Sequence, residues 1–189
     1  MDFEQLQNIE QFEKSSLEFF SGADIERLES MEELSEGRWQ QLEASERLDA
    51  LRDLETKLAD IQGREPRLVE LNSSLSSDVN GFFNPLTGKI TLNEDLLNNR
   101  LNAISTIAHE GRHAYQWDAI IHRGLHPDYQ EVQRWKDCFI NYNDGNPTPQ
   151  DDFFYGNRIA QKLGFAKYWN QPVEVDARLY EENVKHIFC

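Results

Sequence analysis

The spacing of apolar residues predicts that the N-terminal third of the chain is helical. From about residue 3 to 62, apolar side chains recur every three or four positions, with charged residues between them and no proline. The clearest series is Leu48, Leu51, Leu54, Leu58 and Ile61. We expect two or three helices, with breaks at Ser21-Gly22 and Glu36-Gly37 and an end at the glycine and proline of QGREP, Gln62 to Pro66.

The pattern changes near residue 79, where strand-forming residues flank the turn sequence NPLTG. These residues are Val79, Phe82, Phe83, Ile90 and Leu92. The segment from Val79 to Asn93 therefore predicts a β-hairpin, and no other part of the sequence gives a comparable sheet signal.

Helical spacing returns at Glu94 and predicts a helix from about Leu101 to Ile121, with a shorter helix before it. The polar, proline-bearing stretch from Asn141 to Asp152 predicts a loop that could cover a site as a lid. We infer an α+β fold, mostly helical, with a small antiparallel β-hairpin. Two parts are expected, a helical N-terminal arm at residues 1–62 and a core at residues 63–189.

The charge is strongly acidic and unevenly placed. The chain of 189 residues has a net charge of −15, and residues 1–62 hold 17 acidic and 6 basic side chains, which account for −11 of it. This balance argues against nucleic acid or an anionic membrane surface as the partner. We interpret the acidic arm as a helical layer with a solvated face. The alternatives are a surface for a protein partner or inhibitor, and an autoinhibitory segment.

Cysteine usage and the N-terminal sequence bear on localisation. Two cysteines, Cys138 and Cys189, are too few for a disulfide framework and suit a reducing compartment. The start MDFEQLQNIEQFEK lacks the basic and apolar regions of a signal peptide, and no run approaches the roughly 18 apolar residues of a membrane span. We expect a cytoplasmic protein, whose export would need a specialised secretion system.

The stretch STIAHEGRHAYQWDA, Ser105 to Ala119, contains the candidate chemistry. Residues four apart lie on one face of a helix, so His109 and His113 would direct their rings to the same point. Two such imidazoles are good zinc ligands, and Glu110 would act as general base on a metal-activated water in the H-E-x-x-H arrangement. A shuffled chain of this composition would contain the motif at a frequency of about 0.01.

A third protein ligand must come from another segment. The longer pattern H-E-x-x-H-x-x-G-x-x-H is absent, because Gln116 and Ala119 occupy its glycine and last histidine positions. The stretch NQPVEVDARLYEE instead reads as a helix start that offers Glu174, with Asp176 as the alternative ligand. Two histidines, one glutamate and a water form a catalytic zinc set.

These residues carry a family resemblance. HEGRH, followed 61 residues later by EVDA, resembles the gluzincin metallopeptidases, whose third zinc ligand is a glutamate on a later helix. The pair is still more similar to the small zincin-like domains of bacterial polymorphic toxins and phage-associated proteins, over roughly Val79 to Glu182. The resemblance implies one zinc ion per chain on His109, His113 and Glu174, with Glu110 as the base.

The sequence departs from the thermolysin-like gluzincins at one position. Those enzymes support the first histidine with an acidic residue four positions after the glutamate ligand, and Arg178 stands there in this chain. Asp176 is the residue expected to hold a ligand histidine through its other ring nitrogen, or to serve as a plain helix-start acid.

The predicted function is zinc-dependent hydrolysis of a peptide bond in a protein or peptide substrate. The substrate backbone is expected to pair with the extended segment GKITLN, and the resemblance adds a bacterial effector or toxin role. The oxyanion donor is left open among Tyr155, Tyr180, Arg178, His122 and His126. The competing function is a non-catalytic acidic interaction protein whose metal site is structural or vacant.

One glycine in the motif is unexpected. Gly111 lies inside the predicted motif helix, where glycine costs about 1 kcal/mol relative to alanine. Close approach of another backbone at this position would explain it.

Overall fold

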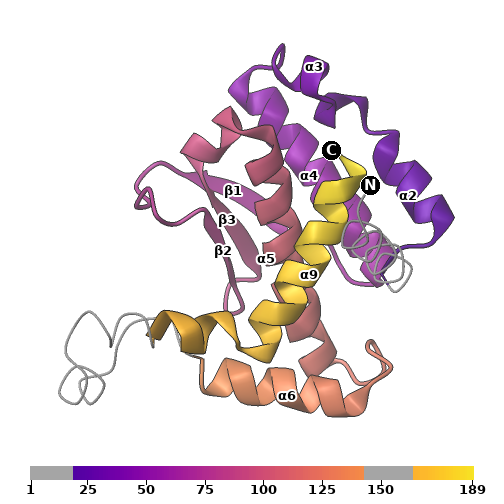
Figure 1. Cartoon of the computed structure of the whole chain (residues 1–189), viewed down its shortest axis with the longest axis vertical. Coiled ribbons are helices and arrows are strands. Elements are labelled where there is room, and N and C mark those ends of the chain that lie inside the picture. Colours follow the sequence, from indigo (N-terminus) through magenta and orange to yellow (C-terminus); the bar gives the residue numbers. More distant parts are fainter. Residues whose placement is uncertain (1–18, 143–163) are drawn as a thin grey trace, which may run out of the picture. The chain divides into compact units, whose positions relative to one another are not determined.

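The computed structural model describes residues 19–142 and 164–189, which form two compact units. The first unit comprises the described residues up to Tyr115 together with Leu179–Cys189, and the second comprises the described residues of Gln116–Arg178. Helices α5 (Arg100–Ile121) and α9 (Pro172–Ile187), both labelled in Figure 1, are each divided between the two units, after Tyr115 and after Arg178 respectively.

The first unit begins with the predicted N-terminal helices. They are α2 (Gly22–Glu29), the 3-10 helix η1 (Glu32–Leu34), α3 (Glu36–Trp39) and α4 (Ala44–Gln62). The predicted break at Ser21-Gly22 is confirmed, because Ser21 caps α2 in a capping box with Asp24. The break predicted at Glu36-Gly37 is misplaced, because both residues lie inside α3 and the break falls at Ser35, the residue before this helix. Gly63 ends α4 with a φ of 69°, a left-handed conformation that favours glycine. Predicted segments before residue 19 lie outside the described residues.

The sheet of the first unit has three strands in the order β1-β3-β2 (Figure 1). Strands β2 (Gly81–Asn84) and β3 (Lys89–Asn93) pair antiparallel and confirm the predicted hairpin. Strand β1 (Leu68–Asn72) also pairs with β3, in parallel, so the sheet is mixed and has one strand more than the predicted hairpin. β1 escapes the sequence pattern because Val69 is its one buried residue, while Leu68 is 54% exposed.

The hydrophobic core of the first unit includes α4, the sheet and the first part of α5. Helix α4 contacts β1 and the 3-10 helix η2 (Glu94–Asn98), which precedes α5. Fully buried apolar side chains come from each of these parts: Leu51, Leu54, Leu58, Val69, Ile90, Leu92, Ile104 and Ile107. The C-terminal part of the predicted arm thus supplies core side chains to the first unit.

Arg100, at the start of α5, ties three segments of the first unit together. Its guanidinium donates to Glu36 at 2.9 Å, to the carbonyl of Leu34 at 2.7 Å and to the carbonyl of Phe188 at 3.0 Å. The hydrogen bond from Arg100, helped by one from Gln40, holds the pKa of Glu36 below its usual value.

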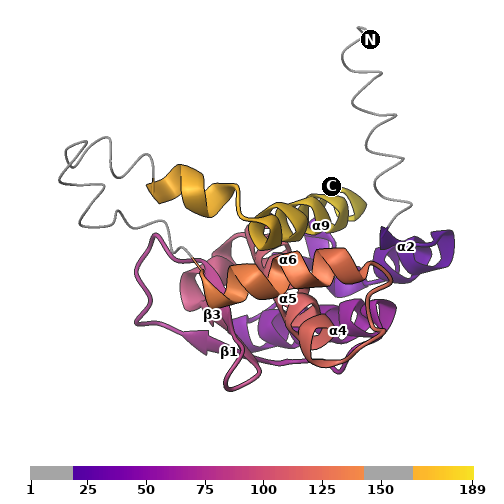
Figure 2. The same cartoon turned by 90° about the horizontal axis from the view of Figure 1, so that it is seen from below.

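The second unit contains the end of α5, helix α6 (Tyr129–Ile140), a short helix at residues 164–169 and the start of α9. Helix α6 runs across the last turn of α5 (Figure 2), and Trp117 of α5 meets Phe139 of α6 edge to face at 5.6 Å. Trp135 is fully buried in this unit. The predicted loop from Asn141 to Asp152 lies, after Tyr142, outside the described residues.

Among the described helices, none combines the length and the apolar character that crossing a membrane requires.

Candidate metal centre

Helix α5 brings the two motif histidines together as the sequence predicts. The helix spans Arg100–Ile121, one residue longer than expected. The Nε2 atoms of His109 and His113 lie 3.1 Å apart, and the rings meet edge to face with centroids at 4.7 Å. Both Nε2 atoms therefore face the same point, as the two imidazole ligands of one ion must.

Glu181 of α9 fixes the orientation of His109 within the first unit. Its Oε2 lies 3.0 Å from Nδ1 of His109. When Nδ1 carries the proton and donates it to this carboxylate, Nε2 keeps its lone pair for a metal. Glu181, and not Asp176, is therefore the acidic residue that meets the other ring nitrogen of His109. Glu181 follows Glu174 by seven residues, two helical turns, so this spacing was the signal that could have identified it.

Glu174 completes a group of three ligand-type side chains. One ligand atom each from His109, His113 and Glu174 lies within 4.8 Å of the other two, so the group could hold a metal ion. Three atoms bound to one zinc at about 2.1 Å would lie about 3.4 Å apart, which is within the 4.8 Å limit of this group. Two imidazole nitrogens and one carboxylate oxygen are also the donor set that suits zinc.

The surroundings of Glu174 are defined within the second unit. Its carboxylate is fully buried, and Oε1 accepts a hydrogen bond from the hydroxyl of Tyr142 at 2.7 Å. Arg178 lies one turn further along α9, with Nη1 at 3.9 Å from Oε2 of Glu174. A buried carboxylate with these partners is held in one orientation, as a metal ligand must be.

Gln116 holds the turn of α9 that carries Glu174. Its side chain is fully buried, and Nε2 donates to the carbonyl of Val173 at 2.9 Å and to Oδ2 of Asp176 at 2.7 Å. The two acceptors stand on either side of Glu174 in the sequence. Ala177, in the same turn of α9, is also fully buried. The last residue of HAYQ and the aspartate of PVEVDA are therefore direct partners.

Glu110 forms a hydrogen bond with the backbone of the sheet. Its Oε2 accepts a hydrogen bond from the backbone N–H of Phe83 in β2 at 2.8 Å. The expectation that GKITLN offers a free edge is wrong, because β3 has β1 on one side and β2 on the other. A local pattern reveals a strand but not its place in the sheet. The edge strand that touches Glu110 is β2.

Gly111 meets side chains rather than backbone, which corrects the expectation. A Cβ at this position would lie 2.9 Å from both Nη2 of Arg64 and Oε2 of Glu55. These two side chains form a bidentate ion pair with contacts of 2.6 and 2.9 Å, and both are fully buried. Glu55 lies in α4, so the motif helix packs directly against a charged pair of the preceding segment.

Tyr180, an oxyanion candidate, belongs to the core of the first unit. It is 1% exposed, and its ring lies 5.2 Å from that of Phe20 and 5.4 Å from that of Phe19. The guanidinium of Arg112 lies 5.2 Å from the centre of the same ring. Burial raises the pKa of Tyr180 above its usual value.

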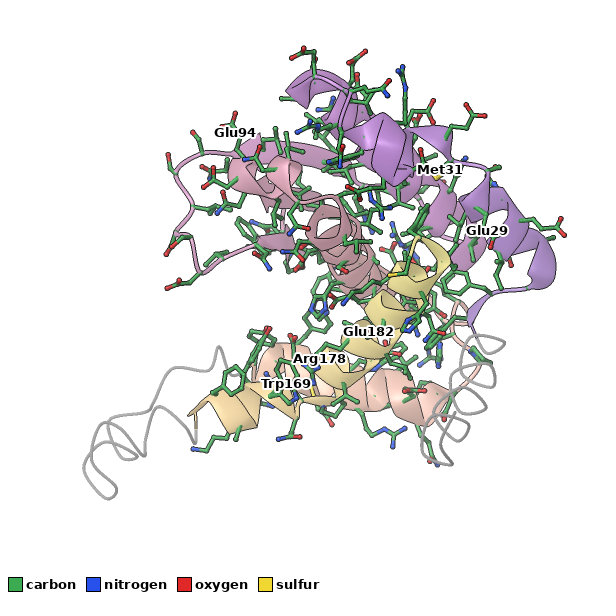
Figure 3. All side chains as sticks on the ribbon, turned by 45° about the horizontal axis from the view of Figure 1, so that its top comes forward. Glu29, Met31, Glu94, Trp169, Arg178 and Glu182 are labelled. Carbon is green, nitrogen blue, oxygen red and sulfur yellow. The ribbon has the colours of Figure 1, made fainter. Side chains whose placement is uncertain are left out.

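The other oxyanion candidates are in different surroundings. His126 packs on Trp135 at 4.7 Å, and its Nε2 lies 3.3 Å from Glu131. Arg178 donates to the carbonyl of Trp169 and lies over its ring at 3.8 Å (Figure 3). His122 is exposed, and Tyr155 lies outside the described residues. Tyr142, whose hydroxyl contacts Glu174, could not be predicted as a site residue, because nothing in the surrounding sequence pattern marks it.

Comparison of the chain with protein-family models, with curated proteins and with solved structures gives no match. The resemblance to gluzincins therefore rests on the two sequence motifs.

Proposed function

We propose that the protein is a zinc-dependent metallopeptidase. The observation that supports this most directly is the group of His109, His113 and Glu174, whose ligand atoms lie within 4.8 Å of one another. Glu110 follows the first of these ligands in the sequence and lies in the same helix, α5. This combination of ligands and carboxylate is the one that the H-E-x-x-H mechanism uses.

Each residue has a definite task in this proposal. His109, His113 and Glu174 hold the ion, and Glu181 keeps the proton of His109 on Nδ1. When bound, zinc supplies Lewis acidity, which polarises the substrate carbonyl and lowers the pKa of a water molecule. Glu110 accepts the proton of the attacking water and delivers it to the leaving amine.

Metal content tests the ligand set. The purified full chain, equilibrated with zinc and dialysed, should retain about one zinc per chain by elemental analysis. His113→Ala and Glu174→Ala should each lower this content while the circular dichroism spectrum persists. The matched control is His122→Ala, which removes an exposed histidine and should leave the zinc content unchanged. Zinc that stays bound after loss of either ligand would contradict the assignment.

Cleavage of fluorescently labelled casein tests the reaction. Turnover should require zinc, and Glu110→Gln should abolish it while the zinc content persists, because the amide cannot accept the proton. A wild-type protein that binds no zinc after reconstitution and cleaves nothing would instead support the non-catalytic interaction protein. Expression of the protein in cells tests the effector role. Toxicity that is lost in Glu110→Gln would support it.

A further inference from the structure

Along β2, the backbone N–H and C=O groups of successive residues point alternately to the two edges of the strand. Just before β2, the carbonyl of Asn80 accepts from the N–H of Asn93 in β3 at 2.8 Å, and at the end of β2 the carbonyl of Asn84 accepts from the N–H of Gly88, the residue before β3, at 2.8 Å. These even-numbered positions therefore face β3. In an antiparallel pair, the backbone N–H and C=O groups of the intervening residues point away from the partner strand. Here these residues are Gly81 and Phe83. The N–H of Phe83 can therefore donate to a group outside the sheet, and it donates to Oε2 of Glu110.

The contact between β2 and α5 is close. A Cβ at Gly81 would lie 2.8 Å from the carbonyl of Thr91 in β3 and 3.0 Å from Cγ2 of Thr106 in α5. Only a hydrogen fits at position 81, so the strand lies directly against its neighbours. Strand β2 and helix α5 are therefore in close contact at this point.

The hydrogen bond from Phe83 to Glu110 is shielded from water. Phe83 is 9% exposed and Glu110 is 8% exposed. A hydrogen bond to a carboxylate is stronger than one between neutral groups, and exclusion of water strengthens it further. The terminal torsion of a glutamate otherwise has a broad energy profile, so an untied carboxylate would rotate readily.

We propose that the backbone N–H of Phe83 is the positioning group of the general base. It holds Oε2 of Glu110 and leaves Oε1 to accept the proton of the attacking water. Strand β2 therefore sets the direction of the base, while α5 carries it. This inference rests on the proposed function for the role of Glu110, whereas the hydrogen bond itself can be measured without any substrate.

Nuclear magnetic resonance of the full chain, isotopically labelled, tests the hydrogen bond. The Phe83 amide proton should resonate downfield of the other amides of β2, as expected for a donor to a carboxylate. In Glu110→Ala the Phe83 amide proton should move upfield and exchange faster with solvent. Both changes should be larger than those of the Leu86 amide proton. The Leu86 amide is the internal control, because it donates to Oδ1 of Asn84 at 2.9 Å in the adjacent turn. A Phe83 signal that does not respond to Glu110→Ala would overturn the proposal.

Replacement of the Phe83 peptide bond by an ester tests the consequence for turnover. The ester of the α-hydroxy acid analogue removes the N–H and keeps the phenyl ring. We expect unchanged zinc content, a nearly unchanged KM and a kcat reduced by about tenfold or more, because general-base catalysis depends on placement of the base. The matched control is the same ester at Leu86, a side chain 92% exposed, which should leave kcat unchanged.

The outcomes separate the positioning role from the proposed function. An unchanged kcat in the Phe83 ester, in a protein that Glu110→Gln inactivates, overturns the positioning role and leaves the peptidase intact. If both esters lower kcat equally, the loss reflects weakening of the hairpin and also overturns it. If the wild type has no turnover, the peptidase proposal fails, and the amide signal alone decides whether β2 positions Glu110.

Discussion

Replacement of Gly111 by alanine should destabilise the protein, although helix propensity predicts the opposite. Alanine in a helix interior is favoured over glycine by about 1 kcal/mol. The added methyl group would, however, lie 2.9 Å from Arg64 and 2.9 Å from Glu55. Overpacking of this kind costs about 1–3 kcal/mol, and disturbing a buried ion pair adds to it, since removal of one partner costs about 3–5 kcal/mol. We expect a net loss of about 2 kcal/mol in the free energy of unfolding.

Thermal and urea denaturation, followed by circular dichroism and tryptophan fluorescence, measures this loss. For a chain of this length, about 2 kcal/mol corresponds to a Tm lowered by about 4–8 °C. The matched control is Gly37→Ala in α3, where a Cβ would meet nothing within 4 Å, so this variant should be unchanged or slightly stabilised. If Gly111→Ala were as stable as Gly37→Ala, the packing of the motif helix on the Glu55–Arg64 pair would be refuted.

Three further predictions follow from the contacts of α5 and α9. Gln116→Ala should lower zinc affinity by about 10–100-fold, as loss of a supporting hydrogen bond does; competition with a chelating dye measures this, and Gln133→Ala, a half-buried glutamine on α6, should show no change. Glu181→Gln should also lower zinc affinity by about tenfold or more, whereas equal affinities of Glu181→Gln and the exposed control Glu182→Gln would contradict its role. Because folding raises the pKa of Tyr180 above the unfolded value of about 10, the contribution of Tyr180 to stability should be fully present below about pH 10 and be lost as the pH rises beyond it. Tyr180→Phe should reduce this loss in urea titrations at high pH.

The sequence was most informative where structure depends on local spacing. The motif helix, the hairpin and the glycine that ends α4 follow from periodicity and turn chemistry, and so do the facing rings of His109 and His113. Each of these features involves residues that are close along the chain. A prediction made from periodicity requires no information about the rest of the fold.

The features that the sequence did not reveal depend on distant partners. Strand β1 is defined by its parallel pairing with β3, and the partner of His109 could have been any acid on a later helix. Both Asp176 and Glu181 fit the chemistry, and only the contacts of the folded chain show that Glu181 meets His109 while Asp176 meets Gln116. The neighbours of Gly111 are likewise charged side chains from another segment. A local pattern shows that a position is special, but not which group it meets.

The buried pair of Glu55 and Arg64 has a consequence for the order of folding. The two residues are near in sequence, on either side of the Gly63 cap, so they can meet as soon as α4 forms. Gly111 comes much later in the chain, and closing that longer loop costs more entropy. We expect α5 to dock on a charged pair that is already assembled. A segment without any metal ligand would then act as the template that determines where the ligands come to rest.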